Sequence, residues 1–158
     1  MIRPATPADV PEIVSMIREL ATYEKAAHEV RVTERQLHDT LFGDRPAAFA
    51  HIAEQDGEVA GFTLWFLTFS TWRGVHGVYM EDLYVRPRHR GGGHGLALMR
   101  ELAGICEQRG YQRLEWAVLD WNEPSIGFYD KLGAVRQDEW LRYRLTDEPL
   151  ERLAGRHD

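Results

Sequence analysis

The sequence predicts a single mixed α/β domain, residues 1–158, in which a central mixed and mostly antiparallel sheet carries helices on both faces. Three observations lead to this prediction: apolar residues at helical spacing near the N-terminus, a strand pair joined by the hairpin signal Asp56-Gly57, and a later strand–glycine turn–helix unit. A hairpin followed by a βαβ unit implies a mixed sheet that is covered on both faces. A length of 158 residues is typical of one domain.

Two helices are expected before the first long strand. Thr6 and Pro7 are typical of a helix start. The apolar residues that follow at helical spacing are Val10, Ile13, Val14, Ile17 and Leu20. Thr33 and Gln36 form a capping-box pattern that begins a second helix, which ends near Gly43.

Strands and helices then alternate along the chain. The expected strands are 49–54, 59–69, 77–85, 114–119 and 140–145, with a weak additional strand at 2–3. A helix follows the glycine turn and ends at Gly110, and a short helix over 124–132 ends at Gly133. The apolar residues at helical spacing in the first of these helices are Leu98, Met99, Leu102, Ile105 and Cys106.

Composition and charge argue against several classes of protein. A content of 44% hydrophobic and 28% charged residues is typical of a globular chain. The net charge of −6 disfavours nucleic acid as a partner and favours a cationic substrate. The longest apolar stretch, 59–69, is shorter than the ~20 residues that span a bilayer, so no membrane partner is expected.

Cysteine and histidine usage point to a reducing compartment and a metal-free site. The single cysteine, Cys106, allows no disulfide within the chain. The first residues lack the pattern of a signal peptide, and we expect a cytoplasmic protein. The seven histidines show no ligand spacing, so no metal is expected.

The segment Val85–Gly95, VRPRHRGGGHG, combines a strand end, a basic turn and a helix start. Free backbone N–H groups at a helix start attract anions, and glycines let an anion approach the backbone closely. Arg86, Arg88 and Arg90 add positive charge to this turn. The pattern predicts a pyrophosphate cradle, whereas the alternative interpretation is a flexible glycine turn with solvated arginines. The segment has neither the lysine of a P-loop nor the last small residue of the dinucleotide-binding motif.

The run Arg90-Gly91-Gly92-Gly93-His94-Gly95 matches the acetyl-CoA signature of the GNAT acetyltransferases in full. Asn122–Tyr129 resembles the second motif of that family, an asparagine followed by a short helix with a tyrosine. The segments 2–6, 19–24, 81–85 and 121–125 are similar to one branch, the diamine (spermidine/spermine) and thialysine acetyltransferases. The resemblance implies a homodimer that transfers an acetyl group from acetyl-CoA to the primary amine of a small cationic acceptor.

The resemblance also implies a role for individual residues. Acetyl-CoA is expected to contact Leu83, Val85, Arg90, Gly91, Gly92, Gly93, His94, Gly95, Asn122, Ser125 and Tyr129. Because a neutral amine must attack, Glu81 is expected to lead the amine proton away, directly or through water. Tyr129 is expected to protonate the departing thiolate. The expected acceptor-binding residues are Glu24, Trp72, Glu81 and Asp82.

Simpler interpretations stay open for several of these residues. Glu81 and Asp82 are adjacent, so alternation sends their side chains to opposite faces of a strand unless a bulge re-aims them. Tyr129 could be a core residue, and Asn122 could serve as a helix cap. Glu24 could be a solvated loop charge.

One difference from the diamine branch bears on the acceptor. Ser70, Ala27 and His28 stand where those enzymes carry acidic residues. Fewer carboxylates disfavour long polyamines, so a short diamine, a lysine-like amine and a peptide amine all stay open as acceptors. A non-catalytic acyl-CoA sensor on the same fold is the competing function. The pair Tyr129 and Glu81 favours catalysis, because a sensor needs neither residue.

Overall fold

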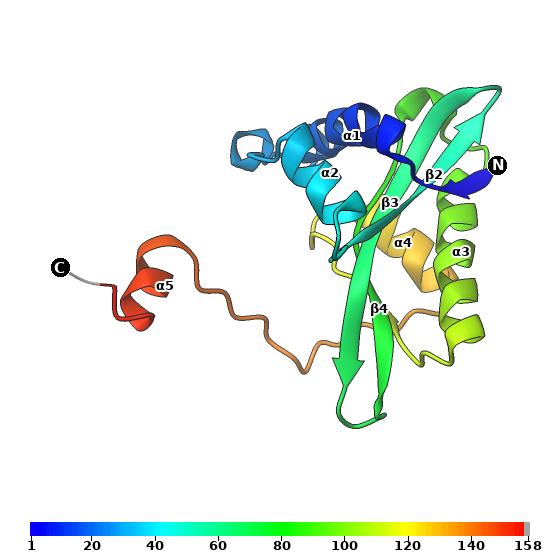
Figure 1. The fold of residues 1–158 in the computed structure, drawn as a ribbon. Coiled ribbons are helices and arrows are strands. Elements are labelled where there is room, and N and C mark those ends of the chain that lie inside the picture. Colours follow the sequence, from blue (N-terminus) through cyan, green and yellow to red (C-terminus); the bar gives the residue numbers. More distant parts are fainter. Residues whose placement is uncertain (157–158) are drawn as a thin grey trace. The chain divides into compact units, whose positions relative to one another are not determined.

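The computed structural model describes residues 1–156. The chain divides into two compact units, Met1–Leu119 and Asp120–Asp158. The first unit contains the sheet and three α-helices, α1, α2 and α3, whereas the described part of the second contains α4 and α5 (Figure 1). Each unit is described by itself.

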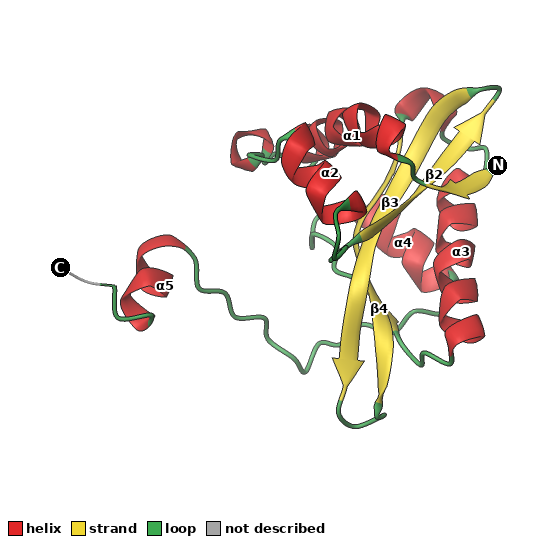
Figure 2. Cartoon of the chain, in the orientation of Figure 1, coloured by secondary structure: helices red, strands yellow, loops and turns green. Residues whose placement is uncertain are grey.

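The sheet of the first unit is mixed and mostly antiparallel, as predicted (Figure 2). Its five strands lie in the order β1 (Ile2–Pro4), β2 (Phe49–Gln55), β3 (Glu58–Ser70), β4 (Val75–Val85) and β5 (Leu114–Glu115). The first four pair antiparallel in succession, and β5 pairs parallel to β4. The predicted hairpin joins β2 and β3, with Asp56 and Gly57 both at positive φ.

Helices lie on both faces of this sheet, which confirms the predicted layers. The helices are α1 (Val10–Tyr23), α2 (Glu34–Phe42) and α3 (His94–Arg109), with short 3-10 turns at η1 (Pro7–Asp9), η2 (Ala27–Glu29) and η3 (Pro87–His89). Figure 1 shows α1 and α2 on one face and α3 on the other. The core on the α1 and α2 side includes Ile13 and Met16 of α1 packed with Phe62 of β3, all fully buried.

The structure confirms the predicted start of the second helix and moves the start of the first. Thr33 accepts a hydrogen bond from the backbone N–H of Gln36, whose side chain accepts one from the Thr33 N–H, so the capping box forms. At the first helix, Thr6 and Pro7 begin the turn η1 rather than α1, which starts at Val10.

The second unit contains α4 (Glu123–Lys131), as predicted, and α5 (Asp147–Leu153), which the sequence pattern did not predict. The strand expected over 140–145 is wrong, because these residues form no regular structure. A strand needs a neighbour for its backbone hydrogen bonds, and an alternating pattern does not supply one. The strand expected over 114–119 is limited to Leu114–Glu115 for the same reason.

Candidate active site

A β-bulge in β4 places Glu81 and Asp82. Across the β3–β4 pair, Asp82 is opposite Leu64 and Met80 is opposite Trp65, so Glu81 is one extra residue in β4. A bulge bends the strand and breaks the alternation of side chains between the two faces of the sheet. Glu81 is exposed and Asp82 is half-buried.

Asp82 is the most perturbed carboxyl group of the site. Burial, and then the nearby carboxylates of Glu81 and Glu24, raise the pKa of Asp82 to about 7. Burial also raises the pKa of Glu24. The structure therefore brings three of the predicted acceptor-binding residues close enough to repel one another, and it makes Asp82 titrate near neutral pH.

The end of β4 offers an open backbone edge beside these carboxyl groups. β5 pairs only with Val78 and Tyr79, whereas β3 follows β4 as far as Val85. Within the described part of the first unit, no strand pairs with this side of 80–85. Leu83 and Val85 lie in this stretch, where an amide-containing substrate could add as a further strand.

The glycine turn has the geometry of an anion-binding helix start. Gly91 and Gly93 adopt left-handed backbone angles, with φ of 85° and 81°. Gly93 is the N-cap of α3 and has no side chain to accept hydrogen bonds, so the first N–H groups of α3, at His94 and Gly95, are available to an anion. No atom lies within 4 Å of a Cβ placed at Gly91 or Gly93, so the turn is open.

The three arginines of this turn differ in how available their charge is to an anion. Arg86 contacts two carboxylates of α1, at 2.7 Å from Nη2 to Glu12 Oε2 and 3.1 Å from Nε to Glu19 Oε2. Arg86 therefore adds little net positive charge to the turn, because the carboxylates of Glu12 and Glu19 compensate its charge. Arg88 pairs with Glu58 at the surface, at 3.4 Å.

Arg90 is held by aromatic and backbone groups instead. Its Nε donates to the Val85 carbonyl at 3.0 Å, and its guanidinium lies 5.8 Å from the ring centres of Tyr23 and Tyr84. Among the residues that the structure describes, no carboxylate lies within ion-pair distance of Arg90. Arg90 therefore keeps a net positive charge beside the glycine turn.

Gln55, for which the sequence predicted no role at the site, supports the same turn. Nε2 of His94, the first residue of α3, lies 2.7 Å from Oε1 of Gln55 at the end of β2. Because an amide oxygen only accepts, His94 donates this hydrogen bond. Gln55 lies next to the hairpin signal, and no feature of its own sequence indicated a contact with the helix start.

Comparison with known proteins identifies the family to which this geometry belongs. The sequence pattern of the Acetyltransferase (GNAT) family matches residues 13–134. The chain belongs to the GNAT acetyltransferase family. It is an N-acetyltransferase that acts on amine acceptors, and its family uses acetyl-CoA as co-substrate.

Named relatives and solved structures agree with this assignment. The thialysine N-epsilon-acetyltransferase of Mus musculus is 37% identical over 166 residues, which cover 98% of this chain and 97% of that protein. An L-ornithine N5-acetyltransferase of Arabidopsis thaliana is 30% identical, with 96% of this chain and 86% of that protein covered. An integron cassette protein from the mobile metagenome of V. cholerae has a TM-score of 0.81 at 28% identity, with 98% and 96% of the two chains covered.

The second GNAT motif of this acetyltransferase lies in the second unit. Asn122 Oδ1 accepts a hydrogen bond from the Ser125 N–H at 3.4 Å, so Asn122 is the N-cap of α4. Tyr129 lies in the last turns of α4 and is half-buried. The capping interpretation of Asn122 is confirmed, while the roles of Asn122, Ser125 and Tyr129 toward acetyl-CoA stay predictions.

Trp72 lies apart from the carboxyl groups of the acetyltransferase site. It occupies the tip of the β3–β4 hairpin, which projects beyond the other strands in Figure 1, and its side chain is 81% exposed. At roughly 3.3 Å per strand residue, the turn is about 20 Å from Glu81 along β4. The structure does not bring Trp72 to Glu81 within one chain, and its expected role in acceptor binding stays a prediction.

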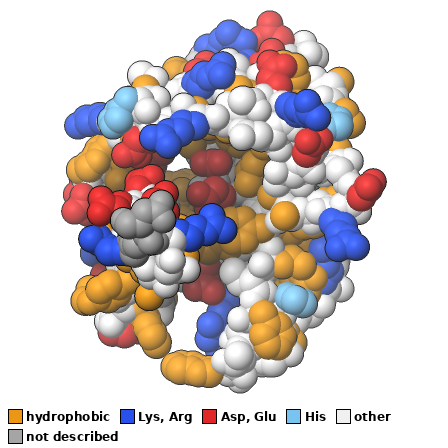
Figure 3. Space-filling view, turned by 60° about the vertical axis from the view of Figure 1, so that its left-hand side comes forward, with side chains coloured by type: hydrophobic (Ala, Val, Ile, Leu, Met, Phe, Trp, Pro, Cys, Tyr) orange, Lys and Arg blue, Asp and Glu red, His pale blue; other side chains and the backbone are white. Residues whose placement is uncertain are grey.

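In residues 1–156, no helix is both long and apolar enough to cross a membrane. The same residues contain no group of three or more His, Cys, Asp or Glu side chains arranged to hold a metal ion. On the face drawn in Figure 3, basic side chains are interspersed with acidic ones.

Proposed function

We propose that this chain acetylates the terminal primary amine of a short, lysine-like amino acid or diamine. The observation that carries the proposal is the group of three carboxyl side chains, Glu24, Glu81 and Asp82, beside the open edge of β4. A cationic amine is attracted to such a group. The named activities of the relatives, on thialysine and on ornithine, support an acceptor of this size.

The proton of the amine defines the first chemical task. An alkylammonium has a pKa near 10.4, so only about one molecule in a thousand is neutral at pH 7. We assign the proton acceptor to Asp82, because a carboxylate that titrates near neutral pH is matched to this task. Glu81, which the sequence analysis favoured for that role, is assigned to attract the ammonium and to raise the pKa of Asp82.

Binding of acetyl-CoA is assigned to the glycine turn and to the end of β4. The N–H groups of 93–95 and the guanidinium of Arg90 would bind the pyrophosphate, and the open edge at Leu83 and Val85 would bind the pantetheine amides. Gly91 and Gly92 would let the phosphates approach the backbone. Bound acetyl-CoA supplies the activated acyl group, and Tyr129 is assigned to donate a proton to the departing thiolate.

The acceptor is tested by release of CoA thiol across an amine panel. We expect kcat/KM to be higher for thialysine, ornithine, lysine and putrescine than for spermine. Ala27 and His28, both exposed in η2, which begins three residues after Glu24, supply no carboxylate for a distant ammonium. A preference for spermine would contradict the proposed acceptor, and acetyl-CoA binding without turnover of any amine would favour a sensor.

We also propose that the chain forms a cytoplasmic homodimer through the segment 139–145. The side chains of Leu141, Tyr143 and Leu145, which alternate along this segment, are 78%, 90% and 49% exposed. A second copy of the chain could pair with this segment and cover these side chains. Light scattering after size exclusion should give twice the chain mass of 18.2 kDa. Leu141→Asp should give the monomer mass, and a monomeric wild type would contradict the proposal.

A further inference from the structure

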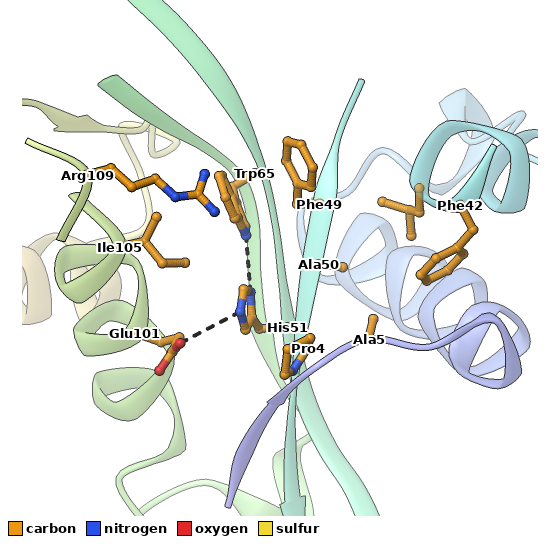
Figure 4. A pocket seen from close by; sticks show the side chains of 11 residues that line it. Pro4, Ala5, Phe42, Phe49, Ala50, His51, Trp65, Glu101, Ile105 and Arg109 are labelled. Atoms are coloured by element: carbon orange, nitrogen blue, oxygen red, sulfur yellow. Dashed lines mark hydrogen bonds and ion pairs between the residues drawn. The ribbon is translucent and has the colours of Figure 1, made fainter. Parts of the chain in front are cut away.

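A second concave site lies two strands away from the carboxyl groups of β4. It is a cavity of about 310 Å³ at the edge of the sheet, bordered by β1, β2, β3, α2 and α3 (Figure 4). Most of its wall is apolar, including Phe42, Phe49 and Ile105. Two charged side chains of α3, Glu101 and Arg109, complete it. Its volume is in the lower range of small-molecule pockets.

The polar end of this cavity is built around His51. The indole N–H of Trp65 donates to Nδ1 of His51 at 3.2 Å. Trp can only donate, so Nδ1 accepts, and the neutral imidazole carries its proton on Nε2. Burial is the main cause that lowers the pKa of His51, so the neutral form predominates at neutral pH.

The second nitrogen of this imidazole points toward the cavity. Figure 4 shows His51 Nε2 facing Glu101, and the distance from Nε2 to Glu101 Oε1 is 3.8 Å, too long for a hydrogen bond. The His51 side chain is only 9% exposed. No other hydrogen-bond partner of Nε2 is found among the described residues. A donor on a nine-tenths buried side chain therefore faces an acceptor across a gap.

A hydroxyl placed beside these two atoms can bridge them. A hydroxyl oxygen at about 2.8 Å from both atoms can accept from Nε2 and donate to the Glu101 carboxylate. An anion at this point would be repelled by Glu101, and an ammonium would meet the Nε2 proton. Behind the polar end, the wall of the cavity is apolar. The ring centres of Phe49 and Trp65 lie 4.7 Å apart, and such a wall favours a flat apolar group.

We propose that this cavity binds a small neutral phenol, whose hydroxyl bridges His51 and Glu101 and whose ring occupies the apolar part. The site is separate from the acetyl-CoA signature, because it is built on β2 and the side of α3 that faces β2 rather than on β4 and the glycine turn. Binding should therefore not require acetyl-CoA or an amine.

The experiment uses p-cresol as the probe and toluene, which lacks the hydroxyl, as its matched control. Titration of the full chain, followed by the indole N–H signals of tryptophan in nitrogen–proton NMR spectra, should show saturable shifts for p-cresol. Toluene should bind about tenfold more weakly, because two hydrogen bonds are lost. Equal binding of the two probes, or no saturable shift with p-cresol, would overturn the proposal.

Variants locate the probe within the chain. Glu101→Ala should weaken p-cresol binding several-fold, and the fold should persist because Glu101 is exposed. Glu107→Ala removes the same charge from an exposed position of α3 outside the cavity and should leave binding unchanged. Ile105→Phe should block the cavity. Retained binding in both Glu101→Ala and Ile105→Phe, or displacement of p-cresol by acetyl-CoA, would show that the probe binds elsewhere and that the proposal is wrong.

Discussion

Nε2 of His94 lies 2.7 Å from Oε1 of Gln55, so the first residue of α3 is hydrogen-bonded to the end of β2. This contact joins the glycine turn to a hairpin from a distant part of the sequence. It reduces the number of conformations that the helix start adopts before an anion binds. Pre-organisation of this kind increases affinity because less entropy is lost on binding.

Gln55→Ala is therefore expected to raise the Kd for acetyl-CoA by about three- to tenfold, the effect of one hydrogen bond. The exposed position of Gln55 implies little change in Tm. Isothermal calorimetry with acetyl-CoA measures the first effect. Gln112→Ala is the control, since Gln112 also makes one exposed side-chain hydrogen bond, to Arg73. This variant should bind acetyl-CoA with the wild-type Kd. Equal affinities in all three proteins would show that the contact does not support binding.

Gly93→Val should abolish measurable acetyl-CoA binding. Its φ of 81° is strained for a β-branched residue, and the new side chain would stand at the start of α3 where the anion is expected. Gly74→Val is a matched control, because Gly74 has a φ of 70°, is equally open and lies in the β3–β4 turn. Both substitutions should lower Tm by similar amounts, and only Gly93→Val should abolish acetyl-CoA binding. Loss of binding in both would attribute the effect to strain.

The pH dependence of the rate should report Asp82. If the ionised carboxylate accepts the amine proton, kcat/KM rises as pH passes through about 7, the pKa of Asp82. Asp82→Asn should abolish this rise and lower the rate at pH 8 by roughly 10²–10⁴. Glu81→Gln should move the rise to lower pH, since the Glu81 carboxylate contributes to the raised pKa. An unchanged profile in Asp82→Asn would assign the proton to another group.

The free energy of unfolding should also depend on the titration of Asp82, and it should fall over the pH range in which the rate rises. The folded protein holds the Asp82 proton up to about pH 7, whereas an unfolded chain loses it near its ordinary value of 3.8. The folded state binds more protons between these values, so this group's contribution to stability falls as pH rises from about 4 to 7. Asp82→Asn removes the loss of stability that follows ionisation of Asp82. The Tm of this variant should therefore exceed that of wild type by more at pH 8 than at pH 4. A uniform difference would contradict the raised pKa.

Tyr129→Phe tests the proton donor for the thiolate. The substitution removes one hydroxyl from a half-buried side chain of α4, so folding and acetyl-CoA binding should change little. We expect kcat to fall by roughly 10²–10⁴, the usual range for a general acid. Tyr111→Phe is the control, because it removes the hydroxyl of another half-buried tyrosine outside α4, and this variant should turn over normally. Wild-type turnover in Tyr129→Phe would show that Tyr129 only packs.

Local signals in the sequence determined much of the fold. The capping pair Thr33 and Gln36, the turn at Asp56-Gly57 and the apolar spacing of α1 and α3 each act between residues close in the chain, and the structure confirms them. The glycine turn was predictable for the same reason, since its left-handed angles at Gly91 and Gly93 need no distant partner.

Tertiary structure alone decided the features that depend on distant partners. The pKa of Asp82 results from burial and from two other carboxylates, Arg86 is compensated by Glu12 and Glu19, and Gln55 contacts His94 across 39 residues. The segment 140–145 alternates like a strand but forms none, because pairing requires a neighbour that an alternating pattern does not specify. The sequence therefore determined which residue types and turns were present, while the packed chain determined which charges are buried, paired or open to a substrate.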